Sequence, residues 1–116
     1  MNKFDKLLRE KAEELARRAE KDKAITISIF EVLKRSDAFS KGWFQLRPGS
    51  KGITSIRDKA ANICSYRVEA GKVIISATLG GDVMSVSEAE ALAEIAELIV
   101  KHRRAVESQE AGEAAA

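Results

Sequence analysis

The stretch CSYRVEAGKVIISATL, residues 64–79, decides the fold because it predicts an antiparallel β-hairpin. Apolar and polar residues alternate on both sides of a short turn at Ala70-Gly71, and Glu69 is expected opposite Lys72. Gly80-Gly81 is expected to end the sheet after the second strand. Strand alternation assigns the apolar positions to two inward-facing sets: Tyr66 and Val68 on the first strand, and Val73, Ile75, Ala77 and Leu79 on the second.

Upstream of the hairpin, residues 3–21 form an amphipathic helical pattern with Asn2 as N-cap. The apolar stripe is thin, and Lys11 interrupts it. Such a helix packs along the edge of a domain or pairs with a second copy. Asp22-Lys23 is expected to end it. The stripe consists of Phe4, Leu8, Leu15 and Ala19.

Residues 24–33, AITISIFEVL, fit two patterns. Ile25, Ile27 and Ile29 alternate with polar residues as in a strand, whereas a spacing of three and four predicts a helix. We favour a helix over residues 28–38, because Ser28 and Glu31 make a capping box. The strand interpretation stays open.

Two short elements are expected between this segment and the hairpin. Residues 43–47, WFQLR, predict a strand that turns Phe44 and Leu46 inward and Trp43, Gln45 and Arg47 outward. Pro48-Gly49 predicts a turn. Residues 53–63 predict a short helix, with Ser55 as its N-cap and Asp58 three residues later.

The last helix is expected to begin at Ser85 or Ser87, each followed three residues later by a glutamate. Its expected buried face is Leu92, Ile95, Ala96, Ile99 and Val106. Residues 109–116 lack an apolar anchor and predict a flexible tail.

Together these elements predict an α+β fold with one domain over residues 1–108 and a tail over 109–116. It would have two N-terminal helices, a small antiparallel sheet of about three strands with a central hairpin, and a C-terminal helix packed on it. The length of 116 residues fits one domain, and 45% hydrophobic and 33% charged residues are typical of a globular chain.

Composition also bears on location. The start of the chain lacks the apolar core of a signal peptide, and no apolar run is long enough to span a bilayer. Cys64 is the single cysteine and has no internal disulfide partner. A cytoplasmic location is therefore expected.

Sequence motifs argue against an enzyme. With one histidine and one cysteine, the chain has no zinc-binding pattern, and it has no nucleotide-binding or nucleophile-elbow motif. We therefore expect no catalytic residue, cofactor or metal. His102 is interpreted as flanking the apolar face of the last helix, and Cys64 as a small core residue.

Charge is distributed unevenly along the chain, and this bears on partners. Residues 1–72 carry 17 basic and 10 acidic side chains, whereas residues 73–116 carry 3 and 8. Residues 41–57, KGWFQLRPGSKGITSIR, contain no acid and hold the only tryptophan. Cations beside an aromatic ring suit nucleic acid, single strands included, since bases stack on aromatic rings and phosphates bind cations. The expected nucleic-acid-binding residues are Lys41, Trp43, Gln45, Arg47, Lys51, Arg57, Lys59 and Arg67.

Several alternatives remain. The same basic patch, with Trp43 as an anchor, can bind an acidic protein, as in an adaptor or inhibitor of the phage or plasmid type. The acidic face of the last helix is a second candidate protein-binding surface, and the chain is expected to form a homodimer. A small-molecule site on the concave side of the sheet is a third possibility. An ordinary solvated surface explains the basic stretch equally well.

Overall fold

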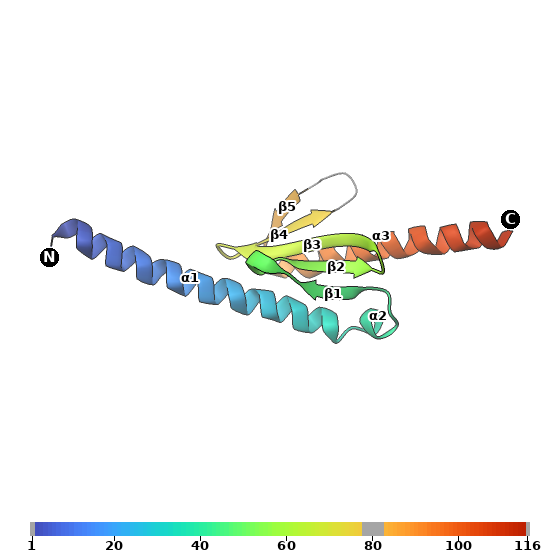
Figure 1. Ribbon diagram of the computed structural model, residues 1–116, viewed down its shortest axis with the longest axis horizontal. Coiled ribbons are helices and arrows are strands. Elements are labelled where there is room, and N and C mark those ends of the chain that lie inside the picture. Colours follow the sequence, from blue (N-terminus) through green and yellow to red (C-terminus); the bar gives the residue numbers. More distant parts are fainter. Residues whose placement is uncertain (1, 78–82, 116) are drawn as a thin grey trace.

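The computed structural model describes residues 2–77 and 83–115. Within them, three α-helices, one short 3-10 helix and five strands form an α+β arrangement, in which a single antiparallel sheet carries the helices on one face (Figure 1). In chain order the elements are α1 (Lys3–Lys34), α2 (Asp37–Ser40), β1 (Gln45–Pro48), η1 (Ser50–Gly52), β2 (Thr54–Asp58), β3 (Ala61–Glu69), β4 (Lys72–Ala77), β5 (Val83–Val86) and α3 (Glu88–Ala115).

Helix α1 is one continuous helix of 32 residues, so the expected break at Asp22-Lys23 and the second helix over residues 28–38 are both wrong. Residues 24–33 are helical because their apolar side chains recur every four residues and meet the core on one side. Ile25, Ile29 and Leu33 are buried there. Ser28 therefore lies inside a helix and caps nothing.

Both N-terminal helices begin at a capping residue. Asn2 is the N-cap of α1, as expected, and its side chain accepts a hydrogen bond from the backbone N–H of Asp5 at 2.9 Å. The second helix, α2, is a single turn whose N-cap, Ser36, accepts from the N–H of Phe39 at 3.2 Å. The expected pair of N-terminal helices is therefore replaced by one long helix and a single helical turn.

The predicted hairpin is confirmed as β3 and β4. Glu69 pairs with Lys72 in the observed register, and Ala70 and Gly71 form the turn with φ values of 51° and 79°. Two consecutive positive φ values are those of a type I′ turn, whose twist matches that of the flanking strands. This hairpin lies at the centre of the sheet, whose strand order is β1-β2-β3-β4-β5.

The sheet is larger than expected, because the helix predicted over residues 53–63 is wrong. Those residues form β2 and the start of β3, joined by a tight turn at Lys59-Ala60. Thr54 and Ile56 are buried while Ser55 is only partly buried, which is the period of two that marks a strand. The Ser55 and Asp58 spacing resembled a helix cap by coincidence.

The sheet also continues past the hairpin. Strand β5 pairs with β4, so a fifth strand lies between the hairpin and the last helix. Leu79 and the expected stop at Gly80-Gly81 fall outside the described residues. Ser87, rather than Ser85, caps α3, because its hydroxyl accepts from the N–H of Glu90 at 3.3 Å. Helix α3 continues to Ala115 through the stretch expected to be a tail.

Both long helices cover the same face of the sheet. The strand residues that are buried at 0–1% exposure alternate along their strands and face α1 and α3: Ile56, Cys64, Tyr66, Val73 and Ile75. Of the expected α3 face, Ile95 and Ile99 are buried and Leu92 and Val106 are partly buried, but Ala96 is exposed. Leu33 of α1, Ala38 of α2, and Leu92 and Ile99 of α3 line one small hollow, so the three helices meet on this side of the sheet.

The molecule is long and narrow, with extents of 77 × 28 × 23 Å. The first half of α1 projects past one end of the sheet and the last turns of α3 past the other (Figure 1). Among the described residues, no helix has the length and apolarity needed to cross a membrane.

Candidate nucleic-acid interface

The face of the sheet opposite the helices, called here the open face, carries a polar row across its strands. Arg47 pairs with Ser55, Ser55 with Ser65, and Ser65 with Ser76. Residues directly opposite in antiparallel strands point to the same side of the sheet, so these four side chains form one line from β1 to β4. The three serines are partly buried, and Arg47 is exposed.

Two further arginines lie on either side of this row. Arg57 follows Ser55 by two residues on β2, and Arg67 follows Ser65 by two residues on β3, so both point to the open face. From the spacing of strands and residues, Arg47 and Arg67 are ~12 Å apart at the backbone. The open face therefore presents three arginines around the row of serines, with Ile74 opposite Arg67 and Asn62 opposite Arg57.

This face has little negative charge. Among the strand residues that the structure describes, Glu69 is the one acidic side chain directed to the open face, and it forms an ion pair with Arg67. Asp58 points the other way and is held by α3. Lys51 and Lys59 are exposed and lie in the connections at the two ends of β2. Arg47, Arg57 and Arg67 therefore keep a net positive charge on the face.

Trp43 does not belong to this face, contrary to the strand predicted over residues 43–47. The strand begins at Gln45, and Trp43 packs against the helices, where it lines the hollow together with Phe44. The guanidinium of Arg103 lies 5.5 Å from the centroid of the Trp43 ring, at cation–π distance. Phe44 is buried as expected, at 2% exposure, and Leu46 packs against the core.

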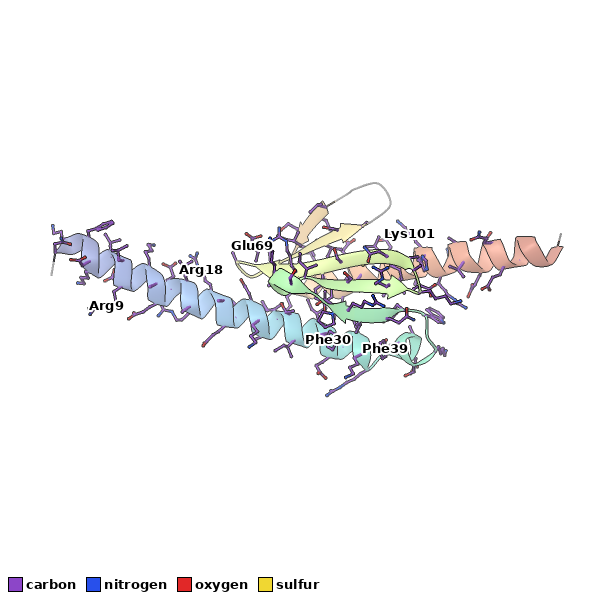
Figure 2. All side chains as sticks on the ribbon, viewed as in Figure 1. Arg9, Arg18, Phe30, Phe39, Glu69 and Lys101 are labelled. Carbon is purple, nitrogen blue, oxygen red and sulfur yellow. The ribbon has the colours of Figure 1, made fainter. Side chains whose placement is uncertain are left out.

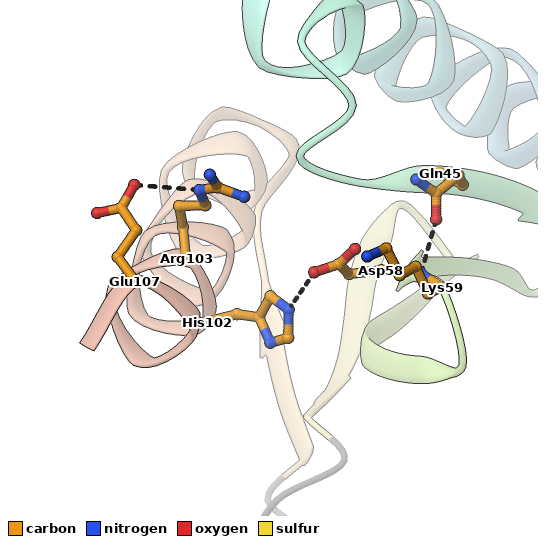
Figure 3. A network of polar contacts seen from close by, with 6 residues as sticks. All are labelled: Gln45, Asp58, Lys59, His102, Arg103 and Glu107. Atoms are coloured by element: carbon orange, nitrogen blue, oxygen red, sulfur yellow. Dashed lines mark hydrogen bonds and ion pairs between the residues drawn. The ribbon is translucent and has the colours of Figure 1, made fainter. Parts of the chain in front are cut away.

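The remaining two predicted binding residues lie at the margin. Gln45 has a structural role: its side-chain oxygen accepts a hydrogen bond from the backbone N–H of Lys59 at 2.9 Å, which holds the β2–β3 turn against β1 (Figure 3). Lys41 is exposed in the turn after α2, on the stretch that leads to Trp43. The structure thus brings together Arg47, Arg57 and Arg67 and separates Lys41 and Trp43 from them.

His102 and Cys64 are both part of the packed fold. His102 on α3 contacts Asp58 at 2.9 Å between Nε2 and Oδ2, which ties the helix to the end of β2 (Figure 3). Burial raises the pKa of the Cys64 thiol to about 12, so the thiol stays protonated at neutral pH. Within residues 2–77 and 83–115, no cluster of three or more potential metal ligands occurs.

The serine row is the part of the site that sequence reasoning missed. A signal for it was present, because Thr54 and Ile56 alternate with Ser55 and Arg57 as in a half-buried strand. The apparent helix cap at Ser55 hid this alternation. Interpreted as a strand, the segment places Ser55 and Arg57 on the solvent side.

Comparison of the chain with protein-family models, with characterised proteins and with solved structures finds no match in any of the three. The functional argument therefore rests on the geometry and charge of the open face.

Proposed function

We propose that the protein binds single-stranded nucleic acid across the open face of its sheet. One observation carries the proposal: Arg47, Arg57 and Arg67 lie on a sheet face without a helix cover in the described residues, around the partly buried hydroxyls of Ser55 and Ser65. The arginines contact phosphates, and the hydroxyls serve as hydrogen-bond partners for phosphate or sugar oxygens.

The small side chains of the serine row favour a single strand over a duplex. Proteins that read duplex DNA insert a helix or a narrow ribbon into a groove, whereas single strands lie across sheet surfaces. Small serine side chains let a chain of nucleotides approach the sheet closely. Aromatic side chains are not part of this surface, since Tyr66 is buried on the other face and Trp43 packs on α3. Bases stack instead on the guanidinium planes of the arginines.

The expected affinity is modest and strongly salt-dependent. Neutralising three phosphates of a single strand gives a slope of about −2 in a plot of log K against log salt concentration, because each contact contributes about −0.7. Arginine forms paired hydrogen bonds to a phosphate, so replacing Arg47 with lysine is expected to weaken binding even though the charge is kept.

A fluorescence-anisotropy titration with a labelled single-stranded oligonucleotide at several salt concentrations tests the proposal. The Arg47→Ala/Arg67→Ala variant should bind more weakly and reduce the salt slope from about −2 to about −0.7. The matched control is Arg9→Ala/Arg35→Ala, which removes the same charge from an exposed position on α1 and from the exposed C-cap that follows it, and should bind like the wild type.

The competing explanations give different results. No saturable binding at low salt, or an equal loss of affinity in both double variants, contradicts the proposal. Tighter binding to a duplex of the same sequence contradicts the single-strand preference. The acidic-protein hypothesis predicts no oligonucleotide binding and remains the alternative for this surface.

A further inference from the structure

The N-terminal arm, defined as residues 3–20 of α1, projects from the molecule with an apolar stripe in solvent. Except for Glu14, which is partly buried, every residue of the arm is exposed. Phe4, Leu8 and Leu15 are 66%, 53% and 60% exposed, and Leu7 beside them is 49% exposed. Figure 2 shows Arg9 and Arg18 on different sides of this helix, and Arg18 lines a hollow with Ala70 and Gly71 at the tip of the β3–β4 hairpin.

The stripe continues the helix face that forms the core farther along α1. Leu8, Leu15, Asp22 and Ile29 are spaced at intervals of seven residues, so they lie along one seam of the helix. Ile29 is 2% exposed because the sheet covers this seam, whereas Leu8 and Leu15 are 53% and 60% exposed. The arm thus carries a core-type surface that the chain itself does not cover.

The charges within the stripe are partly neutralised. Lys11 and Arg18 lie on the seam side, and both form ion pairs with Glu14 on the same helix. These contacts, first the hydrogen bond from Lys11 and then the charge of Arg18, lower the pKa of Glu14. The arm as a whole has six basic and five acidic side chains. This near-balance offers no attraction to an anionic membrane or an acidic protein and no repulsion between two identical arms.

From these observations we infer that the arm is a homodimerisation surface, on which the stripes of two copies of the chain pair in antiparallel orientation. A parallel pair is sterically excluded, because the partner helix would run along the seam into the space that the sheet occupies from Ile25 onward. An antiparallel partner helix has its N-terminus on the arm side of the sheet and therefore does not enter this space. Two-fold symmetry pairs each stripe with itself, and the register that we infer places Phe4 of one copy near Leu15 of the other and Leu8 near Lys11 of the other.

The area is adequate for a weak dimer. At ~150 Å² for a large apolar side chain, the four exposed apolar residues offer about 90 Å² each, or ~700 Å² over two arms. With flanking alanines and aliphatic stems, the total reaches roughly 1,000 Å², near the lower end for specific interfaces. A dissociation constant in the micromolar range is therefore expected.

Sedimentation velocity over a concentration series up to ~100 μM tests the inference. The wild type should approach the mass of a dimer, and Leu8→Glu/Leu15→Glu should be monomeric with an unchanged circular dichroism spectrum of the folded body. The control Ile27→Glu/Val32→Glu changes two exposed apolar residues of α1 outside the stripe and should still dimerise. A wild type that stays monomeric, or a Leu8→Glu/Leu15→Glu variant that dimerises, overturns the inference.

Disulfide formation tests the orientation without depending on the charged variants. In the antiparallel dimer, a mixture of Phe4→Cys chains and Leu15→Cys chains should cross-link, whereas neither variant alone should, because equivalent residues then lie about 16 Å apart along the helix. Cys64 is buried and does not take part. Cross-linking of either variant alone, or none in the mixture, overturns the antiparallel pairing.

Discussion

The carboxylate of Asp22 accepts a hydrogen bond from the backbone N–H of Gly71 at 2.8 Å, across 49 positions of sequence. Its other oxygen accepts from the N–H of Ala70 at 2.9 Å. One side chain in the middle of α1 therefore holds the tip of the β3–β4 hairpin. It also marks the boundary on α1 between the half that covers the sheet and the arm that projects from it.

Replacing Asp22 is expected to destabilise the fold. Asp22→Ala removes two charge-assisted hydrogen bonds at a partly exposed site, so the free energy of unfolding should fall by about 1–2 kcal/mol. Asp22→Asn keeps one acceptor oxygen, so its free energy of unfolding should lie between those of the wild type and Asp22→Ala. Urea denaturation measures the effect, and Glu20→Ala, an exposed acid on the same helix, is the control. Equal stability of Asp22→Ala and Glu20→Ala would show that the contact contributes nothing.

A substitution at Ala70 in the hairpin turn is expected to increase the stability of the fold. Its φ of 51° is left-handed, where an alanine costs roughly 1 kcal/mol because its Cβ approaches the following carbonyl. Asparagine tolerates this conformation and precedes glycine in favoured type I′ turns. Ala70→Asn should raise the melting temperature and the free energy of unfolding by about 0.5–1 kcal/mol. Ala70→Val should lower both. A loss of stability in Ala70→Asn would contradict the observed turn.

The burial of Cys64 is expected to make the protein less stable in alkaline solution. Its pKa rises from 9.0 to about 12 in the folded protein because the thiol is buried. Above pH 9.0 the unfolded chain ionises while the folded one stays neutral, so the stability present below that pH is lost as pH rises toward about 12. The loss approaches ~1.4 kcal/mol per pH unit. Burial also raises the pKa of Tyr66, which adds to the loss at higher pH.

Urea midpoints measured at about pH 8, 9 and 10 for the wild type and Cys64→Ala separate this contribution from that of lysine and tyrosine. At the lowest pH, Cys64→Ala should be less stable than the wild type, because alanine fills less of the buried space than cysteine. The difference in urea midpoint between the wild type and Cys64→Ala should become smaller as pH rises, because only the wild type loses the contribution of the neutral thiol. A constant gap contradicts the ionisation argument.

Trp43 is expected to act in stability rather than in binding. It packs between the helices and under Arg103, so Trp43→Ala should lower the free energy of unfolding by about 2 kcal/mol, whereas Arg103→Ala should cost about 0.5–1 kcal/mol. Folded Trp43→Ala protein should bind single-stranded oligonucleotide with the affinity of the wild type. If Trp43→Ala had unchanged stability and a large loss of affinity for the oligonucleotide, Trp43 would be part of the binding surface, contrary to this prediction.

The hairpin and the last helix could be predicted because their signals are local. Alternation around Ala70-Gly71 and a serine–glutamate cap at Ser87 each specify an element without help from distant residues. The course of α1 could not be predicted in this way. Ile25 and Ile29 fit a strand or a helix, and the sheet they pack against decides between them.

The candidate site could be predicted only in part. Arg47, Arg57 and Arg67 were expected to bind, but their common face depends on the register of β1, β2 and β3, which the sequence does not specify. Trp43 was assigned to that face by extending strand alternation two residues too far. The strand starts at Gln45, and the preceding chain turns toward α3.

Nuclear magnetic resonance tests most directly whether the open face binds single-stranded nucleic acid. A single-stranded oligonucleotide is added to ¹⁵N-labelled protein, and the shifts of backbone amides are mapped onto the structure. The largest changes are expected at Ser55, Ser65, Ser76, Arg47 and Arg67, with little change along α3. No changes at saturating oligonucleotide, or changes concentrated on α3 and around Trp43, would contradict the proposed function.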